Sequence, residues 1–181
     1  MLSKKSKNKI CIAIISACIL TLITTVGIYA FFPCKYRDEV IKTCNNTPIA
    51  PDLAFAVIRC ESSFDKDKVS KKGAVGLMQI MPTTGEYISQ LYFGGINFDL
   101  YSPNDNLLLG VTYLSYLLEK FKDLKTALAS YNAGEGRVLN WLSQKDFSLD
   151  GKKLTSIPFK ETESYVNKVL LYRKFYKFLW L

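Results

Sequence analysis

An uncharged, largely apolar run extends from Ile10 to Phe32 and dominates the first part of this 181-residue chain. A helix needs about 20 such residues to cross the hydrocarbon core of a bilayer. Four lysines precede the run, at positions 4, 5, 7 and 9, and no acidic residue does. Because positively charged flanks stay in the cytoplasm, the pattern predicts a single-pass membrane anchor with a cytoplasmic N-terminus and an extracytoplasmic remainder.

A cleaved signal peptide, which would release a secreted protein, is the alternative interpretation of this run. The apolar region of a signal peptide usually has about 7–15 residues and precedes small residues at a cleavage site. The run is longer than this, and Ile28, Tyr29 and Ala30 fit such a site poorly. We therefore favour a retained anchor, and either interpretation exports the rest of the chain.

The chain divides by composition into four parts. We expect a basic tail (residues 1–9), the anchor (10–32), a polar connector (33–48) and one domain (49–181). The net charge is +8, and the four lysines of the tail supply half of it. The remainder is mildly basic and lacks a dense basic stripe, so we expect no nucleic acid but some attraction to anionic polymers.

The absence of histidine excludes a large part of enzyme chemistry. Ser-His-Asp and Cys-His nucleophile systems cannot form, and a zinc hydrolase site would lack its usual ligand. The sequence also has no CxxC pair. We therefore expect no metal and no cofactor, and acid–base work must come from Glu, Asp, Lys, Tyr or Cys.

Three cysteines lie outside the anchor, Cys34, Cys44 and Cys60. In an oxidising compartment Cys44 could pair with either of the other two. The odd number leaves at least one thiol free or pairing between chains.

Apolar spacing after the connector predicts an all-α, α-dominated domain. Pro51 suits the first position of a helix that runs to about Cys60. Thr83 and Thr84 are expected to cap a helix that Gly94 and Gly95 end, and further helices are expected over residues 104–121, 124–131, 137–142 and 161–179. Strand signals are weak, and residues 70–80 could hold a small irregular hairpin at most.

Glu61 is the first candidate for chemistry, because it follows the apolar end of the helix that begins at Pro51. The negative end of a helix dipole and burial among Val57, Ile58 and Phe64 both disfavour ionisation of a carboxyl. A carboxyl that stays protonated near neutral pH can serve as a general acid. Gly76, Met78 and Gln79 follow in a turn that offers backbone freedom, an adaptable apolar surface and hydrogen-bonding groups.

Five short motifs occur in order: ESSF (61–64), SKKGAVGLMQIMP (70–82), NLLLGVTYL (106–114), ASYNAG (129–134) and IPFKETESYV (157–166). Together they resemble the lytic transglycosylase family, in particular the soluble murein transglycosylases and their membrane-bound relatives. The resemblance covers residues 49–181 and implies a lysozyme-like fold with a long saccharide groove. It implies that Glu61 is the catalytic acid, with substrate contacts or site geometry assigned to Ser70, Met78, Gln79, Tyr131, Asn132 and Glu161.

The implied substrate is peptidoglycan, cut between N-acetylmuramic acid and N-acetylglucosamine with formation of 1,6-anhydro ends. Ordinary glycosidases use two carboxylates, and the motifs place no second acid beside Glu61. Asp65 and Asp67 lie in a DKDK sequence that is typical of a solvated turn. A hydrolytic muramidase on the same fold and a non-catalytic wall-binding scaffold remain alternatives, and a partnership with cell-wall, secretion or transfer machinery stays open.

Overall fold

The computed structural model describes residues 4–180 and divides after Pro33 into two compact units. The first unit contains one helix, α1 (Lys4–Phe31). Its window Ile14–Phe31 has a mean hydropathy of 2.1, and none of its residues is buried. By length and composition this helix can cross a membrane, although a signal sequence passes the same test.

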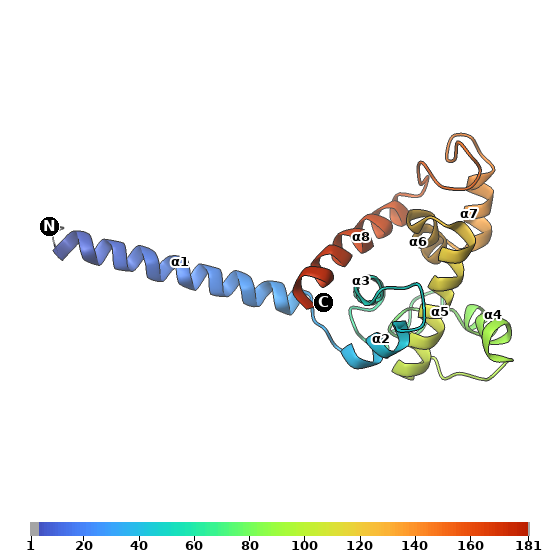
Figure 1. Ribbon diagram of the computed structural model, residues 1–181, viewed down its shortest axis with the longest axis horizontal. Coiled ribbons are helices and arrows are strands. Elements are labelled where there is room, and N and C mark those ends of the chain that lie inside the picture. Colours follow the sequence, from blue (N-terminus) through green and yellow to red (C-terminus); the bar gives the residue numbers. More distant parts are fainter. Residues whose placement is uncertain (1–3, 181) are drawn as a thin grey trace. The chain divides into compact units, whose positions relative to one another are not determined.

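Residues 34–180 fold into seven helices connected by irregular segments (Figure 1). They are α2 (Arg37–Cys44), α3 (Pro51–Glu61), α4 (Pro82–Phe93), α5 (Pro103–Phe121), α6 (Leu124–Ala133), α7 (Glu135–Leu142) and α8 (Lys160–Trp180). No strand occurs in this range; Val75 forms isolated antiparallel bridges with Val69 and Ile80. The predicted all-α class is therefore confirmed, and the expected irregular hairpin lies at residues 69–80.

Helix α3 is the buried centre of the second unit. Every residue from Asp52 to Ile58 is buried, and α8 packs along it (Figure 1). The Phe55 ring stacks on Tyr176 of α8 with 5.4 Å between centroids. Asp52 is the charged residue within this apolar surface, and Arg173 of α8 compensates it through an Nε to Oδ2 contact of 2.9 Å.

The helix boundaries follow local capping chemistry. Ser102 and Asp123 cap α5 and α6 by accepting from the amides of Asp105 and Thr126. The predicted Thr83–Thr84 cap is wrong, because α4 begins at Pro82, whose fixed φ angle suits the first helical position. Gly94 does end α4, with a φ of 65°.

Helix α2 was not predicted and lies within the segment that composition marked as a connector. It contacts both α3 and α5, and its Val40 and Cys44 are buried. Its sequence did not indicate this packing, because only Val40 and Cys44 of its eight residues are buried. Cys18, Cys34, Cys44 and Cys60 are all free thiols, so neither suggested pairing of Cys44 is present.

Candidate active site

Glu61 is the last residue of α3. The helix cannot continue because Ser63 and Phe64 both have positive φ angles, 55° and 67°. The Ser62 hydroxyl accepts a hydrogen bond from the Phe64 amide at 3.1 Å and fixes this reversal. The Glu61 carboxyl thus lies at the negative end of the helix dipole, where ionisation is disfavoured.

The Glu61 carboxyl is crowded by protein although part of the side chain remains accessible. Loss of water raises its pKa from 4.5 to about 7, against smaller lowering effects of the Tyr165 hydroxyl and the Lys68 ammonium group. Lys68 is held nearby because its Nζ donates to the backbone carbonyl oxygen of Glu61. No other carboxylate of the described residues contributes to this shift.

Two tyrosines from distant helices face this carboxyl. Tyr131 of α6 donates from its hydroxyl to the Met78 carbonyl oxygen at 2.8 Å. Tyr165 of α8 has a buried hydroxyl that lies close to Glu61 but falls short of a complete hydrogen bond with any described residue. Burial first and the Glu61 charge second raise the pKa of both phenols well above the usual value, so both stay protonated donors.

The turn after Glu61 is held in shape by its own backbone and by Gln79. Val75 and Ile80 exchange two backbone hydrogen bonds of 3.0 Å. The Gln79 side-chain nitrogen donates to the carbonyl oxygens of Lys68 and Gly76. At the other end, Ser70 closes the loop by accepting from the Ala74 amide at 3.0 Å.

Helix α5 holds this turn in place through two residues that lie one helical turn apart. The buried Asn106 accepts from the Met78 amide at 2.8 Å and donates to the carbonyl oxygens of Val75 and Leu100. Gly110 leaves room for Met78, since a Cβ there would lie 2.4 Å from the sulfur. These contacts place the Met78 carbonyl where Tyr131 can reach it.

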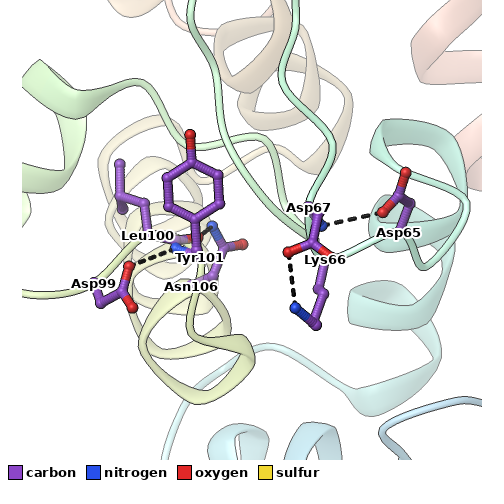
Figure 2. A network of polar contacts seen from close by, with 7 residues as sticks. All are labelled: Asp65, Lys66, Asp67, Asp99, Leu100, Tyr101 and Asn106. Atoms are coloured by element: carbon purple, nitrogen blue, oxygen red, sulfur yellow. Dashed lines mark hydrogen bonds and ion pairs between the residues drawn. The ribbon is translucent and has the colours of Figure 1, made fainter.

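Asp65 and Asp67 do not belong to this arrangement. Figure 2 shows them on the loop after α3, where Asp65 accepts from the Asp67 amide and Asp67 pairs with Lys66. All three side chains are exposed. Asp65 and Asp67 therefore stabilise a local turn on the surface. The same view shows Asn106, which donates to the carbonyl oxygen of Leu100 in the loop that leads into α5.

Residues 39–153 match the family model described as the Transglycosylase SLT domain, which is more than half of the chain. The chain belongs to the transglycosylase SLT domain family. The soluble lytic murein transglycosylase of Salmonella typhimurium is 36% identical over 152 residues, covering 81% of this chain and 23% of that protein. Membrane-bound lytic murein transglycosylase C of Histophilus somni is 31% identical, over 58% of this chain and 32% of that protein.

The crystal structure of the 70 kDa soluble lytic transglycosylase from Escherichia coli shares the fold of this SLT domain. It superimposes with a TM-score of 0.72 at 31% identity, covering 83% of this chain and 25% of that one. The predicted lysozyme-like fold is thereby confirmed. The chain spans about a quarter of the length of the soluble relatives that it matches.

The SLT domain brings four of the predicted site residues into one arrangement. Tyr131 lies close to Glu61 and donates to the carbonyl oxygen of the buried Met78, and Gln79 follows Met78 in the same turn. Ser70 stands at the far end of the same turn, and its oxygen is engaged with the Ala74 amide.

Asn132 and Glu161 have different positions. The Asn132 side chain accepts from the Thr162 hydroxyl at 2.8 Å and so ties α6 to α8. Glu161 is an exposed residue in the first turn of α8, one turn before Tyr165. Asn132 therefore fixes the spacing of the helices that carry Tyr131 and Tyr165, while Glu161 touches neither the Glu61 carboxyl nor its tyrosines.

Three residues that act on the carboxyl or hold the turn beside it were not singled out from the sequence. Tyr165 and Asn106 lie inside the quoted motifs and are buried on the inner faces of α8 and α5. Their helical spacing from apolar residues of the same helices is the sequence signal that could have identified them. Lys68 carries no such signal, because an exposed lysine in a charged loop is indistinguishable from its neighbours until the loop folds back onto Glu61.

Proposed function

We propose that this SLT domain is a peptidoglycan lytic transglycosylase in which Glu61 acts first as general acid and then as general base. The observation that carries the proposal is a lone carboxyl with a pKa raised to about 7, beside two protonated tyrosines. Near neutral pH such a group is present in both protonation states, which suits a residue that gives and then takes a proton.

The reaction begins with transfer of the Glu61 proton to the glycosidic oxygen that follows N-acetylmuramic acid. As the C1–O bond breaks, the muramoyl acetamido group stabilises the positive charge at C1, because no second carboxylate is available for this. The Glu61 carboxylate then removes the proton of the C6 hydroxyl, and O6 attacks C1. The product is a 1,6-anhydro sugar, the acid is regenerated and no water is consumed.

The surrounding residues support this sequence as positioning groups. The Tyr165 hydroxyl lies close to Glu61 and can donate to its carboxylate after the proton has left. Tyr131 holds the turn that carries Gln79, which we assign to sugar contact together with Ser70 and Glu161. The Met78 side chain is fully buried against Gly110, so Met78 shapes the site through its carbonyl oxygen and does not contact the sugar. Asn132 keeps α6 and α8 in register for the two tyrosines.

Product analysis tests the proposal. Purified full-length protein in non-ionic detergent is incubated with peptidoglycan, and mass spectrometry should find anhydro-muramoyl ends. Glu61→Gln should reduce their rate of formation at least about 100-fold. Glu119→Gln, which alters an exposed glutamate in the last turn of α5, is the matched control and should retain activity.

Two other outcomes would replace this proposal. Hydrated reducing ends in place of anhydro ends would make the protein a muramidase that uses the same acid. Binding of peptidoglycan without cleavage, equal for the wild type and Glu61→Gln, would favour a wall-binding scaffold.

We further propose that α1 spans the membrane once, with the N-terminus in the cytoplasm and the SLT domain outside. The apolar window Ile14–Phe31 and the preceding lysines support this orientation. Protease added to spheroplasts should digest the SLT domain and leave a membrane-bound fragment. A mature chain in the soluble fraction that lacks the apolar run would show instead that the segment is a cleaved signal.

A further inference from the structure

The outward face of α8 changes character halfway along the helix. Tyr165, Val169 and Tyr176 form its buried face against α3. On the opposite side the first half carries Lys160, Ser164, Asn167 and Lys168, as expected for a surface helix.

The second half of this outward face carries large apolar side chains. Leu171, Phe175 and Phe178 follow one another at i, i+4 and i+7, and we call them the α8 stripe. They are 50%, 37% and 86% exposed. Such a row on the outside of a helix marks a surface that contacts something apolar.

The charges around the stripe are mostly positive, although Glu163 lines the same hollow as Lys168 and Leu171. No acidic residue follows Glu163 in the sequence, whereas Lys168, Lys174 and Lys177 are exposed on the same half of α8. The remaining cation there, Arg173, is already paired with Asp52. An apolar row flanked by lysines is the composition of helices that lie at the surface of an anionic bilayer.

The chain enters the second unit close to this end of α8. Burial chiefly raises the pKa of Tyr176, the Arg59 charge opposes this, and a Cys34 thiolate would raise the pKa further, so Cys34 lies near the stripe's half of the helix. Cys34 follows the apolar run with one residue between. Two backbone steps span at most roughly 7 Å, so a membrane anchor that ends at Phe32 would leave Cys34 beside the headgroups.

We propose that the α8 stripe docks on the lipid surface and holds the catalytic unit against the membrane. This inference rests on the membrane anchor of the proposed function, and not on its chemistry. The stripe lies on the far side of α8 from the face that carries Tyr165. Docking therefore leaves the Glu61 site uncovered while it fixes the orientation in which that site meets the wall.

Trp180 lies about 200° around the helix from Phe178 and so off the α8 stripe, and Trp141 is the other tryptophan of the chain. Phe175→Trp therefore places the reporter of docking within the stripe. Full-length protein carrying Trp141→Phe, Trp180→Phe and Phe175→Trp is reconstituted into nanodiscs of phosphatidylcholine with phosphatidylglycerol, with ordinary or dibrominated acyl chains. Because bromine quenches tryptophan only within the apolar boundary, docking should lower the fluorescence of this reporter at least about twofold in brominated discs.

Variants of the α8 stripe distinguish docking of the catalytic unit on lipid from simple attachment through the membrane anchor. Leu171→Ser with Phe178→Ser should restore most of the fluorescence, since the anchor is intact but the stripe is lost. Leu149→Ser is the matched control, because Leu149 is 84% exposed on a loop after α7, and it should leave the quenching unchanged.

Several results would overturn the proposal. Absence of quenching with Leu171 and Phe178 intact, or equal quenching after their replacement, would show that the stripe does not meet lipid. Equal quenching in discs of phosphatidylcholine alone would overturn the assignment to anionic lipid. Fluorescence changes that depend on the number of copies per disc, and not on bromine, would assign the stripe to a second copy of the chain.

Peptidoglycan cleavage measured on the same samples distinguishes this proposal from the proposed function. Loss of quenching with retained formation of anhydro ends would refute docking alone. Quenching without any cleavage would refute the transglycosylase activity and leave docking intact.

Discussion

Replacing Glu61 by glutamine should make the folded protein more stable at alkaline pH while it abolishes activity. The carboxyl titrates near 7 in the folded state and near 4.5 in the unfolded chain. Below pH 4.5 both states hold the proton, and stability is unaffected. As pH rises from 4.5 to 7 only the folded state keeps it, so the free energy of unfolding falls.

The size of this effect follows from the two pKa values. A separation of one pH unit corresponds to about 1.4 kcal/mol. The full loss above pH 7 is therefore about 3 kcal/mol, of which about 2.5 kcal/mol falls between pH 5 and 8. Glutamine cannot ionise, so Glu61→Gln should lack this loss and exceed the wild type by about 3 kcal/mol at pH 8.

The chain is unusually well suited to the measurement, because it contains no histidine to titrate in the same range. Urea unfolding of the full chain in non-ionic detergent, followed by tryptophan fluorescence at pH 5 and pH 8, gives both free energies. Glu119→Gln controls for the loss of one exposed carboxylate and should keep the pH dependence of the wild type. An equal decline in wild type and Glu61→Gln would refute the reasoning, since the carboxyl would then be ordinary.

Other substitutions test the frame around the carboxyl. Asn106→Ala removes three hydrogen bonds, two of them buried and one partly buried, so urea unfolding should show a loss of about 3 kcal/mol; an unchanged midpoint would show that the turn is stable without them. Gly110→Ala forces a methyl group against Met78, so the free energy of unfolding should fall by about 1–3 kcal/mol in the same assay. An unchanged free energy of unfolding would contradict this close packing. Lys68→Met removes a cation that lowers the Glu61 pKa, so the alkaline limb of the pH–rate profile should move to higher pH; movement to lower pH would contradict this.

Helix positions in the SLT domain were largely predictable because they depend on local chemistry. Pro51 starts α3, Gly94 ends α4, and the apolar period of α5 and α8 appears directly in the sequence. The failures were also local. Pro82 took the role expected of the two threonines after it, and α2 showed too few apolar residues to reveal its packing.

The chemistry of the residues alone indicated Glu61 and the turn that carries Gln79, whereas Tyr131 was expected only from the family resemblance. Sequence spacing put Glu61 at a helix end next to apolar residues, and the direction of its pKa shift followed from that. Asn132 was grouped with the sugar contacts but ties α6 to α8, because a helix-end asparagine can face either a ligand or a neighbouring helix. Tyr165, 104 residues further along the chain, has a role that no local pattern shows.

The sequence by itself determined where the helices run, that one apolar segment can cross a membrane, and that acid–base chemistry falls to groups other than histidine. Only the tertiary structure decided which groups surround the Glu61 carboxyl and how strongly they hold its proton. The physical reason is that capping and periodicity act over a few residues, whereas desolvation depends on every atom that displaces water. Those atoms come from α6, α8 and the turn after α3, and folding alone brings them together.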